Sequence, residues 1–368
     1  MKRIIPLVIL SFFLFSCDDS SVDEKVNYDR TAFLENLADN LIIPGFNDFA
    51  TKTGDLSTAV EAFKNEPSEV NLLRVQEALK SSWLSYQYVA YFQVGPSADV
   101  FFRDEVNVYP ASITEIEAKI SSQNYDFTGA TNIDVKGFPA VDYMINGTAN
   151  TKAEIVNYYT DASEGTNRMA YLEKLVQEIN SFASTIQQAW PNYRDTFVSA
   201  AGTDIGSSTG KLVNEFNLQF DLRLKNGKIG IPSGVKSLQE TLPEKAECYY
   251  GAYSKELAIA SAQAALDIFR GTHFEGATNG QGLDDYVTAL NVTSNGEPLA
   301  ALIESRIQAS IDQMELIEPS IVEAAQSYNE SGALVQSYFA LQAVIPLIKV
   351  DMTSAMGVTI TFQDNDGD

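Results

Sequence analysis

The chain has 368 residues, 45% of them hydrophobic, and a formal net charge of −24 at pH 7. A surface this acidic repels phosphate backbones, which argues against nucleic acid as a partner. The length allows two domains that each bury a core of their own. Acidic residues keep such a protein soluble and raise the local concentration of cations only modestly, so the charge alone identifies no ligand.

The N-terminus has the pattern of a signal peptide. Two basic residues precede an apolar stretch, Ile4–Phe15, that is too short to span a bilayer as a permanent helix. The next residues, Ser16 and Cys17, resemble the end of a bacterial lipobox, in which a small residue precedes the cysteine that receives the lipid. We therefore expect residues 1–16 to be a lipoprotein signal peptide. The alternative is an ordinary signal peptide followed by a chance cysteine.

A lipid on Cys17 predicts a membrane-anchored protein of the cell envelope, on the periplasmic side or at the cell surface. Each buried methylene of an acyl chain contributes about 0.8 kcal/mol to such anchoring. Residues 17–27 would then form a tether. Loss of residues 1–16 removes two cations and no acids, so the formal charge changes from −24 to −26. Because Cys248 is the only other cysteine, stability must come from apolar cores and not from a disulfide.

The long segments that follow repeat their apolar residues with the period of a helix. Ser68–Phe92, Glu164–Trp190 and Leu299–Ile317 each carry one apolar stripe at spacings of three and four residues. A fourth stripe runs over Leu334–Met352, where Pro346 predicts a kink because it lacks an amide proton. After the N-terminus, no apolar run is expected to approach the length of a membrane span. Helices with one apolar face bury it by packing together, which predicts an all-α fold of helical bundles.

The segment Ala200–Gly210 contains three glycines and five Ser, Thr or Asp residues, which is typical of a linker. We therefore place a domain boundary at residues 201–210. An N-terminal helical bundle is expected over residues 28–200 and a C-terminal one over residues 211–368. Packed side by side, two such bundles leave a cleft at their interface.

Four separated patches resemble the imelysin family, in the order in which that family has them. They are Trp83 to Pro110, which includes Arg103; Lys136–Ile145; Lys228–Gly234 with Leu242–Glu247 and Ser254; and Met356–Phe362, before the acidic end Asp364–Asp368. The resemblance implies two domains of packed helices with a site between them. It also implies an association with iron uptake and, for some members, a metallopeptidase activity.

The sequence departs from that family at its motif, Gly-x-His-x-x-Glu. Here the segment is Gly137-Phe138-Pro139-Ala140-Val141-Asp142, with proline in the place of histidine and aspartate in the place of glutamate. A histidine and a carboxylate three residues apart on a helix point the same way and can hold one metal ion. Proline has no donor atom, so Asp142 remains as a lone carboxylate. It can bind a hard cation with other ligands, or form hydrogen bonds across the domain interface.

From the resemblance, the candidate ligand or metal site comprises Gly137, Asp142, Arg103, Glu247 and Ser254. Asp142 is the residue expected to contact an iron or another divalent metal ion. Glu247 and Ser254 are expected to face it from the second half of the chain, and Arg103 to pair with one of these acids.

The remaining residues offer little catalytic chemistry. The only histidine, His273, lies in a turn-rich segment, and the sequence has no His-Glu-x-x-His motif. A catalytic zinc ion normally needs three protein ligands, mostly histidines. Gly206–Gly210 matches Gly-x-Ser-x-Gly, but the single histidine would have to serve any catalytic triad built on it. We therefore predict no catalytic residue. The acidic end Asp364–Asp368 stops before the bidentate acid of a calcium loop and is interpreted as a solvated tail.

Aromatic residues are dense between Trp83 and Tyr109, where they fit a core better than a pocket, and Cys248 fits a small buried hydrophobe. The favoured function is a non-enzymatic, lipid-anchored binding component of iron or metal uptake, with a metal ion or an envelope transport protein as partner. The alternatives are a metallopeptidase of the imelysin family and an envelope docking protein for a partner protein or a glycan.

Overall fold

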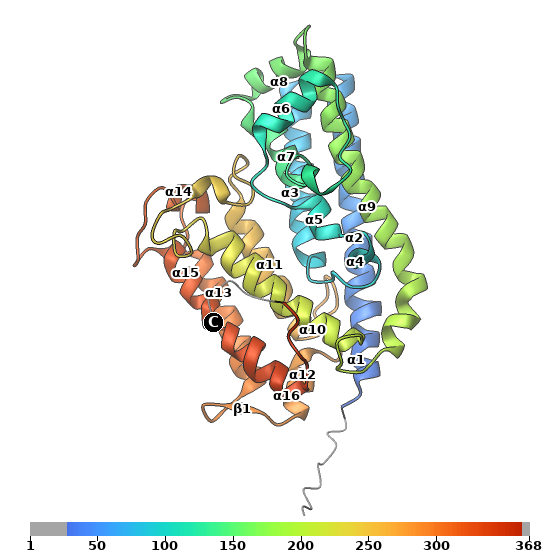
Figure 1. Ribbon diagram of the computed structural model, residues 1–368, viewed down its shortest axis with the longest axis vertical. Helices are drawn as coiled ribbons and strands as arrows, with labels where there is room; N and C mark the ends of the chain where they lie inside the picture. Colours follow the sequence, from blue (N-terminus) through green and yellow to red (C-terminus); the bar gives the residue numbers. More distant parts are fainter. Residues whose placement is uncertain (1–27, 363–368) are drawn as a thin grey trace, which may run out of the picture.

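The computed structural model describes residues 28–362 and confirms the all-α fold (Figure 1). The signal peptide, Cys17, the tether and the acidic end Asp364–Asp368 lie outside these residues. The first half contains α1 (Arg30–Asn36), η1 (Leu37–Ile42), α2 (Ile43–Asn65), α3 (Glu69–Val89), α4 (Pro96–Asp99), α5 (Phe102–Val106), α6 (Ile113–Ser122), η2 (Ala130–Asn132), α7 (Gly137–Asp142), η3 (Tyr143–Gly147), α8 (Lys152–Thr160) and α9 (Gly165–Ser199). The second half contains α10 (Ser208–Leu218), η4 (Gln219–Gly230), η5 (Pro243–Lys245), α11 (Ser254–Phe269), α12 (Leu283–Ala289), β1 (Thr293–Ser294), β2 (Glu297–Pro298), α13 (Leu299–Glu315), α14 (Ile321–Ala324), α15 (Ala333–Gln342), η6 (Pro346–Met352) and α16 (Thr353–Met356).

The first half is built on three long helices, α2, α3 and α9, which run side by side in Figure 1. Local sequence sets where they begin. Asp29 caps α1, which leads directly through η1 into α2, and Ser68 caps α3 by accepting a hydrogen bond from the amide of Asn71. The apolar stripe predicted for Ser68–Phe92 is buried, from Leu72 to Tyr86. The helical period of the sequence therefore predicts correctly which face of α3 is buried.

The second half packs α11, α13 and α15 against one another and against the long π-helix η4. Helix α11 also contacts α3, so the two halves share an interface (Figure 1). The predicted linker is a loop only up to Ser207, which caps α10; its last three residues form the first turn of that helix. The division of the chain into two domains at residues 201–210 stays a prediction.

The C-terminal helical segment corrects one expectation. Ala333–Met356 is long and apolar enough to cross a membrane by length and composition, although no such second run was expected. Half of its most apolar window is buried, and its helices contact α13 and η4, as in a core helix of a folded domain. A turn at residues 343–344 interrupts the helix just before Pro346, where the kink was predicted.

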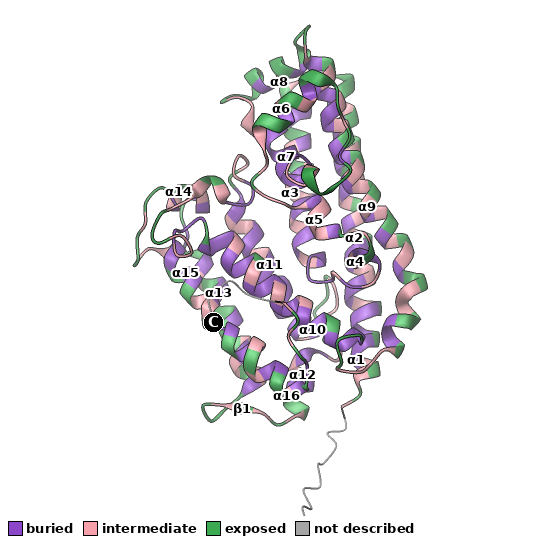
Figure 2. Ribbon diagram, viewed as in Figure 1, coloured by how far each residue is buried: buried purple, intermediate pink, exposed green. Residues whose placement is uncertain are grey.

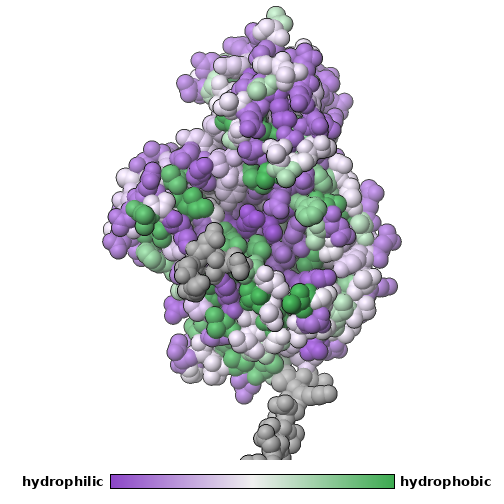
Figure 3. All heavy atoms as spheres, in the orientation of Figure 1, coloured by the Kyte–Doolittle hydropathy of each residue, from purple (hydrophilic) through white to green (hydrophobic). Residues whose placement is uncertain are grey.

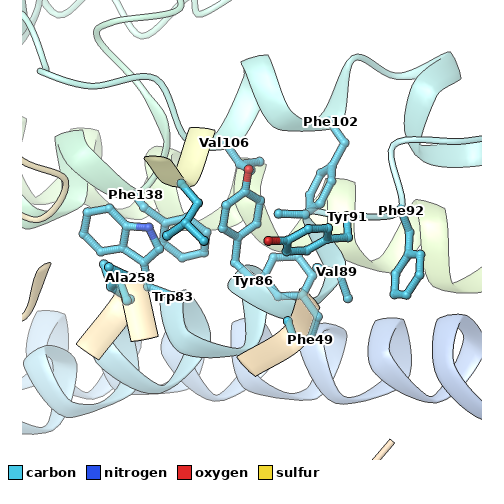
Figure 4. Packing of buried hydrophobic residues seen from close by; sticks show 14 of the residues in the cluster. Phe49, Trp83, Tyr86, Val89, Tyr91, Phe92, Phe102, Val106, Phe138 and Ala258 are labelled. Atoms are coloured by element: carbon cyan, nitrogen blue, oxygen red, sulfur yellow. The ribbon is translucent and has the colours of Figure 1, made fainter. Parts of the chain in front are cut away.

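Most of the dense aromatic segment forms core, as predicted, although Phe101 is 67% exposed and Tyr109 lines a pocket. Trp83, Tyr86 and Phe102 are at most 1% exposed and lie against Phe49 and Phe138 (Figure 4). Buried residues follow the inner faces of the helices throughout the molecule (Figure 2). On the face shown in Figure 3, hydrophobic side chains lie in small groups among hydrophilic ones. The aromatic core holds α3, α5 and α7 together and so fixes the position of the segment that carries Asp142.

Candidate functional site

The short helix α7 begins at a glycine that no other residue can replace without strain. Gly137 has φ +74°, and a Cβ atom there would lie 2.3 Å from the carbonyl oxygen of Val106. The next residue, Phe138, stacks on Trp83 with ring centroids 5.4 Å apart. The close backbone approach and the buried ring fix the orientation of α7, so Gly137 has a structural role.

The helix α7 places Pro139 and Asp142 in the wall of a pocket of about 240 Å³. The first half of the chain supplies α7 and the segment Tyr109–Ile113, and the second half supplies the segment from Glu244 to Tyr250. The complete lining is Tyr109, Pro110, Ala111, Ile113, Pro139, Asp142, Glu244, Ala246, Cys248, Tyr249 and Tyr250. The motif segment therefore faces a pocket to which both halves of the chain contribute.

Asp142 lines this pocket and is only 1% exposed. Its Oδ1 accepts a hydrogen bond of 2.9 Å from the side-chain amide of Asn146, one turn later on the π-helix η3. Its Oδ2 accepts one of 3.0 Å from the backbone amide of Tyr250. The carboxylate is thus held by groups from both halves of the chain.

The loop from the second half approaches Asp142 closely because residue 251 is glycine. A Cβ atom on Gly251 would lie 2.9 Å from Asp142 Oδ1 and 2.8 Å from Cys248 Sγ. Cys248 itself has φ +55°, in the left-handed region. The glycine and the left-handed backbone of Cys248 thus bring the thiol within hydrogen-bond reach of the carboxyl group.

Burial dominates the electrostatics of this pair. It raises the pKa of Asp142 to about 6, although hydrogen bonds from Asn146, from the amides of Tyr250 and Gly251 and from Cys248 favour the charged form. Burial and the nearby Asp142 carboxylate also raise the pKa of the Cys248 thiol well above its usual value. The thiol therefore stays protonated at neutral pH, which makes it a poor nucleophile.

Glu247 lies beside the pocket but its carboxylate does not line it. The side chain is fully buried and forms an ion pair with the ammonium group of Lys228 on η4. Its other oxygen accepts hydrogen bonds from Asn107, at 2.7 Å, and from Gln87, at 3.2 Å. Burial lowers the pKa of Lys228, and the Glu247 carboxylate opposes that shift. Glu247 is thus a neutralised, hydrogen-bonded member of the interface between the halves.

The other two candidate residues also have structural partners. The Ser254 hydroxyl donates a hydrogen bond to the backbone carbonyl of Glu247, at the start of α11. Arg103 forms an ion pair of 3.0 Å with Glu215 on α10, so it pairs with neither Asp142 nor Glu247 as was expected. Of the five predicted site residues, Asp142 alone lines the pocket.

His273 lies elsewhere, in the loop between α11 and α12. Its backbone amide donates to the carbonyl of Thr278, and the amide of the next residue, Phe274, donates to the carbonyl of Asn40. The loop therefore packs against the N-terminal helices, and its histidine is not part of the pocket lining.

Within residues 28–362, no three His, Cys, Asp or Glu side chains converge as a metal-binding group does. In the pocket, Pro139 has no donor atom, and Asp142, Glu244 and Cys248 do not converge on one point. Three protein ligands are usual for a catalytic zinc ion. The residues of this pocket therefore do not fit a resident transition metal.

Sequence reasoning missed several residues that form the pocket. It identifies Cys248 only as a small buried hydrophobe, and it does not single out Tyr109, Tyr249 and Tyr250 as lining. Tyr249 and Tyr250 lie between Glu247 and Ser254, which belong to the third patch that resembles the imelysin family. This position is the only signal that the sequence offers for them. Asn146, one turn after Asp142, can be found from its spacing of four residues.

The fold and the pocket define an all-helical protein with a binding pocket formed by both halves of the chain. The imelysin family model matches residues 42–346, so the chain belongs to the imelysin family. No curated protein matches the sequence.

Two examples stand among the solved structures that share the fold. One is a putative iron-regulated protein A precursor from Parabacteroides distasonis ATCC 8503, with a TM-score of 0.72 and 14% sequence identity over 89% of this chain and 95% of that one. The other is an imelysin-like protein from Psychrobacter arcticum 273-4, with a TM-score of 0.67 and 13% identity over 90% of this chain and 97% of that one. At these identities the likeness establishes the fold.

Proposed function

We propose that this imelysin-family protein is a lipid-anchored, non-enzymatic binding component of the bacterial envelope that serves iron or metal uptake. The lipobox-like sequence at Cys17 supports the anchor. The family membership and the iron-regulated protein among its structural neighbours support the association with iron. The pocket around Asp142 is the proposed binding site.

The observation that carries the proposal is the pocket itself. Pro139 and Asp142, the two motif positions that would hold a metal, both line it, and the second half of the chain closes it. A proline in the place of the imidazole removes a metal ligand and leaves the cavity. Such a site retains the means to bind a ligand without a coordination shell for metal-assisted hydrolysis.

Growth under iron limitation tests this function in a strain that lacks the gene. The wild-type protein should restore growth, whereas Cys17→Ser should not, because it removes the anchor. Ala111→Phe fills the pocket from its partly exposed wall and should also fail. Ala118→Phe, at an exposed position of α6 outside the pocket, is the matched control and should restore growth. Full rescue by Ala111→Phe would show that the pocket is not the functional site.

The metallopeptidase alternative makes a separate prediction. It requires cleavage of an unfolded protein substrate that depends on added metal and is abolished by Asp142→Ala. Such turnover would replace the binding function by an enzymatic one.

The docking alternative is favoured by the tyrosines of the pocket, since aromatic rings stack on sugar rings as well as on protein groups. It predicts that neutral oligosaccharides or a peptide bind and that Tyr250→Ala removes that binding, while added metal has no effect.

A further inference from the structure

We infer that the pocket binds a small organic ammonium ion, held between the carboxylate of Asp142 and the tyrosines of the wall. This inference rests on the proposed function because it uses the same pocket. It adds the charge and the chemical class of the ligand.

The first argument is that Asp142 is buried without a counter-ion. Its interactions are with dipoles: the amides of Asn146, Tyr250 and Gly251 and the thiol of Cys248. Among the described residues no basic side chain forms an ion pair with it, and none is among the main influences on its pKa. Buried carboxylates are usually paired or coordinate a cation, because an isolated buried charge is costly. A positively charged ligand in the pocket would supply the missing charge.

The contrast with Glu247 strengthens this argument. Glu247 lies next to Cys248 in the loop that approaches Asp142 and is as deeply buried as Asp142, but Lys228 neutralises it. The fold therefore supplies a cation to one of two neighbouring buried acids and leaves the other, which faces the pocket, unpaired.

The second argument is the charge of the lining. Asp142 and Glu244 are acidic, Glu244 at an exposed position, and no lysine, arginine or histidine of the described chain lines the pocket. Electrostatic complementarity therefore favours a cation and disfavours carboxylates and phosphates.

The third argument is the aromatic wall. Tyr109, Tyr249 and Tyr250 line the pocket, and the rings of Tyr249 and Tyr250 lie 5.0 Å apart at 81°. Tyrosine faces attract ammonium groups through the ring quadrupole, and quaternary ammonium ligands are recognised in aromatic cages. Prolines 110 and 139 and Ile113 offer apolar surface to the alkyl part of such a ligand.

The fourth argument is that the pocket suits an ammonium group better than a bare metal ion. A hard divalent cation takes six or more oxygen ligands. The carboxylates of Asp142, which already accepts several hydrogen bonds, and Glu244 do not supply them. An ammonium group needs only one or two acceptors and a desolvated surface around it.

The volume of the pocket limits the size of the ligand. At about 240 Å³ the pocket is below the usual size for drug-like ligands, so the ligand is a small amine or the head group of a larger one.

The test is titration calorimetry of the full mature chain with a charged probe and its neutral isostere. Choline and dimethylbutanol, in which carbon replaces the nitrogen, have nearly the same shape. Butylammonium and butanol form a second pair for primary amines. The charged member of at least one pair should bind about tenfold more tightly or better.

The variants assign that preference to the pocket. Asp142→Asn should abolish the preference for charge, and Tyr250→Leu should weaken binding of the charged probe several-fold without a change of net charge. Asp284→Asn is the matched control: burial raises the pKa of that carboxyl to about 6 as well, but it lies outside the pocket lining. It should bind like the wild type. Circular dichroism establishes that each variant is folded.

Equal affinity for charged and neutral probes, a preference for acetate, or the absence of binding by either charged probe would overturn the inference. These outcomes are distinct from failure of the proposed function. If Ala111→Phe still fails to support growth, the pocket has a function and only the charge assignment is wrong. If Ala111→Phe restores growth, the proposed function fails whatever the titrations show.

Discussion

Replacing Asp142 by asparagine removes a carboxyl group that titrates differently in the folded and unfolded chain. Burial raises its pKa from 3.8 to about 6 in the folded state. One pKa unit corresponds to about 1.4 kcal/mol, so the shift amounts to about 3 kcal/mol of unfolding free energy. Because the folded chain holds this proton more tightly, the stabilisation is fully present below pH 3.8 and is lost as the pH rises through 6.

Urea unfolding of the wild type and of Asp142→Asn between pH 3 and pH 8 measures this effect. The difference between their free energies of unfolding should change by about 3 kcal/mol across that range, with the wild type losing stability relative to the variant as the pH rises. Other acidic residues titrate in both proteins and cancel in the difference. Parallel curves, or a wild type that gains relative stability with pH, would refute the argument that Asp142 is buried without a counter-ion.

The remaining predictions concern the neighbouring residues. Pro139→His restores an imidazole three residues before Asp142, and it should create micromolar or tighter binding of Zn²⁺, seen as a metal-dependent rise in melting temperature that the wild type lacks. Gly137→Ala should lower the free energy of unfolding by about 2 kcal/mol or more, because the new Cβ meets a backbone carbonyl at positive φ; an unchanged urea midpoint would contradict the close approach of α5 to α7. Lys228→Met should cost about 3–5 kcal/mol by leaving the Glu247 carboxylate unpaired, and Glu247→Leu in the same chain should recover much of that loss in thermal unfolding.

The long helices could be predicted from periodicity, with errors at their ends. The apolar stripe identifies a helix over Glu164–Trp190, yet α9 continues through Pro191 to Ser199. Phe197 and Val198 are buried in this last part, so tertiary packing extends the helix through the proline. A single stripe of apolar residues does not reveal such an extension, because it depends on the rest of the core.

The site was predictable only where a local motif marked it. The segment from Gly137 to Asp142 identified α7, but the hydrogen bond from the Tyr250 amide joins residues 108 positions apart and leaves no local pattern. The charge partners were equally hidden. Glu247 could pair with any buried cation, and the fold brings Lys228 to it and not Arg103. The sequence shows which charged residues are available, whereas the packing of the two halves decides which are buried and which of them meet.

The central claim is that the pocket holds its ligand through an unpaired carboxylate and not through a metal ion. A crystal of the wild-type protein soaked with iron or zinc salts and, separately, with choline tests it through element-specific anomalous scattering and difference density. The account predicts density for the ammonium ion against Asp142 and Tyr250, and no anomalous peak within bonding distance of that carboxylate. An ordered transition metal bound by Asp142 and Cys248, with no density for the ammonium ion, would contradict it.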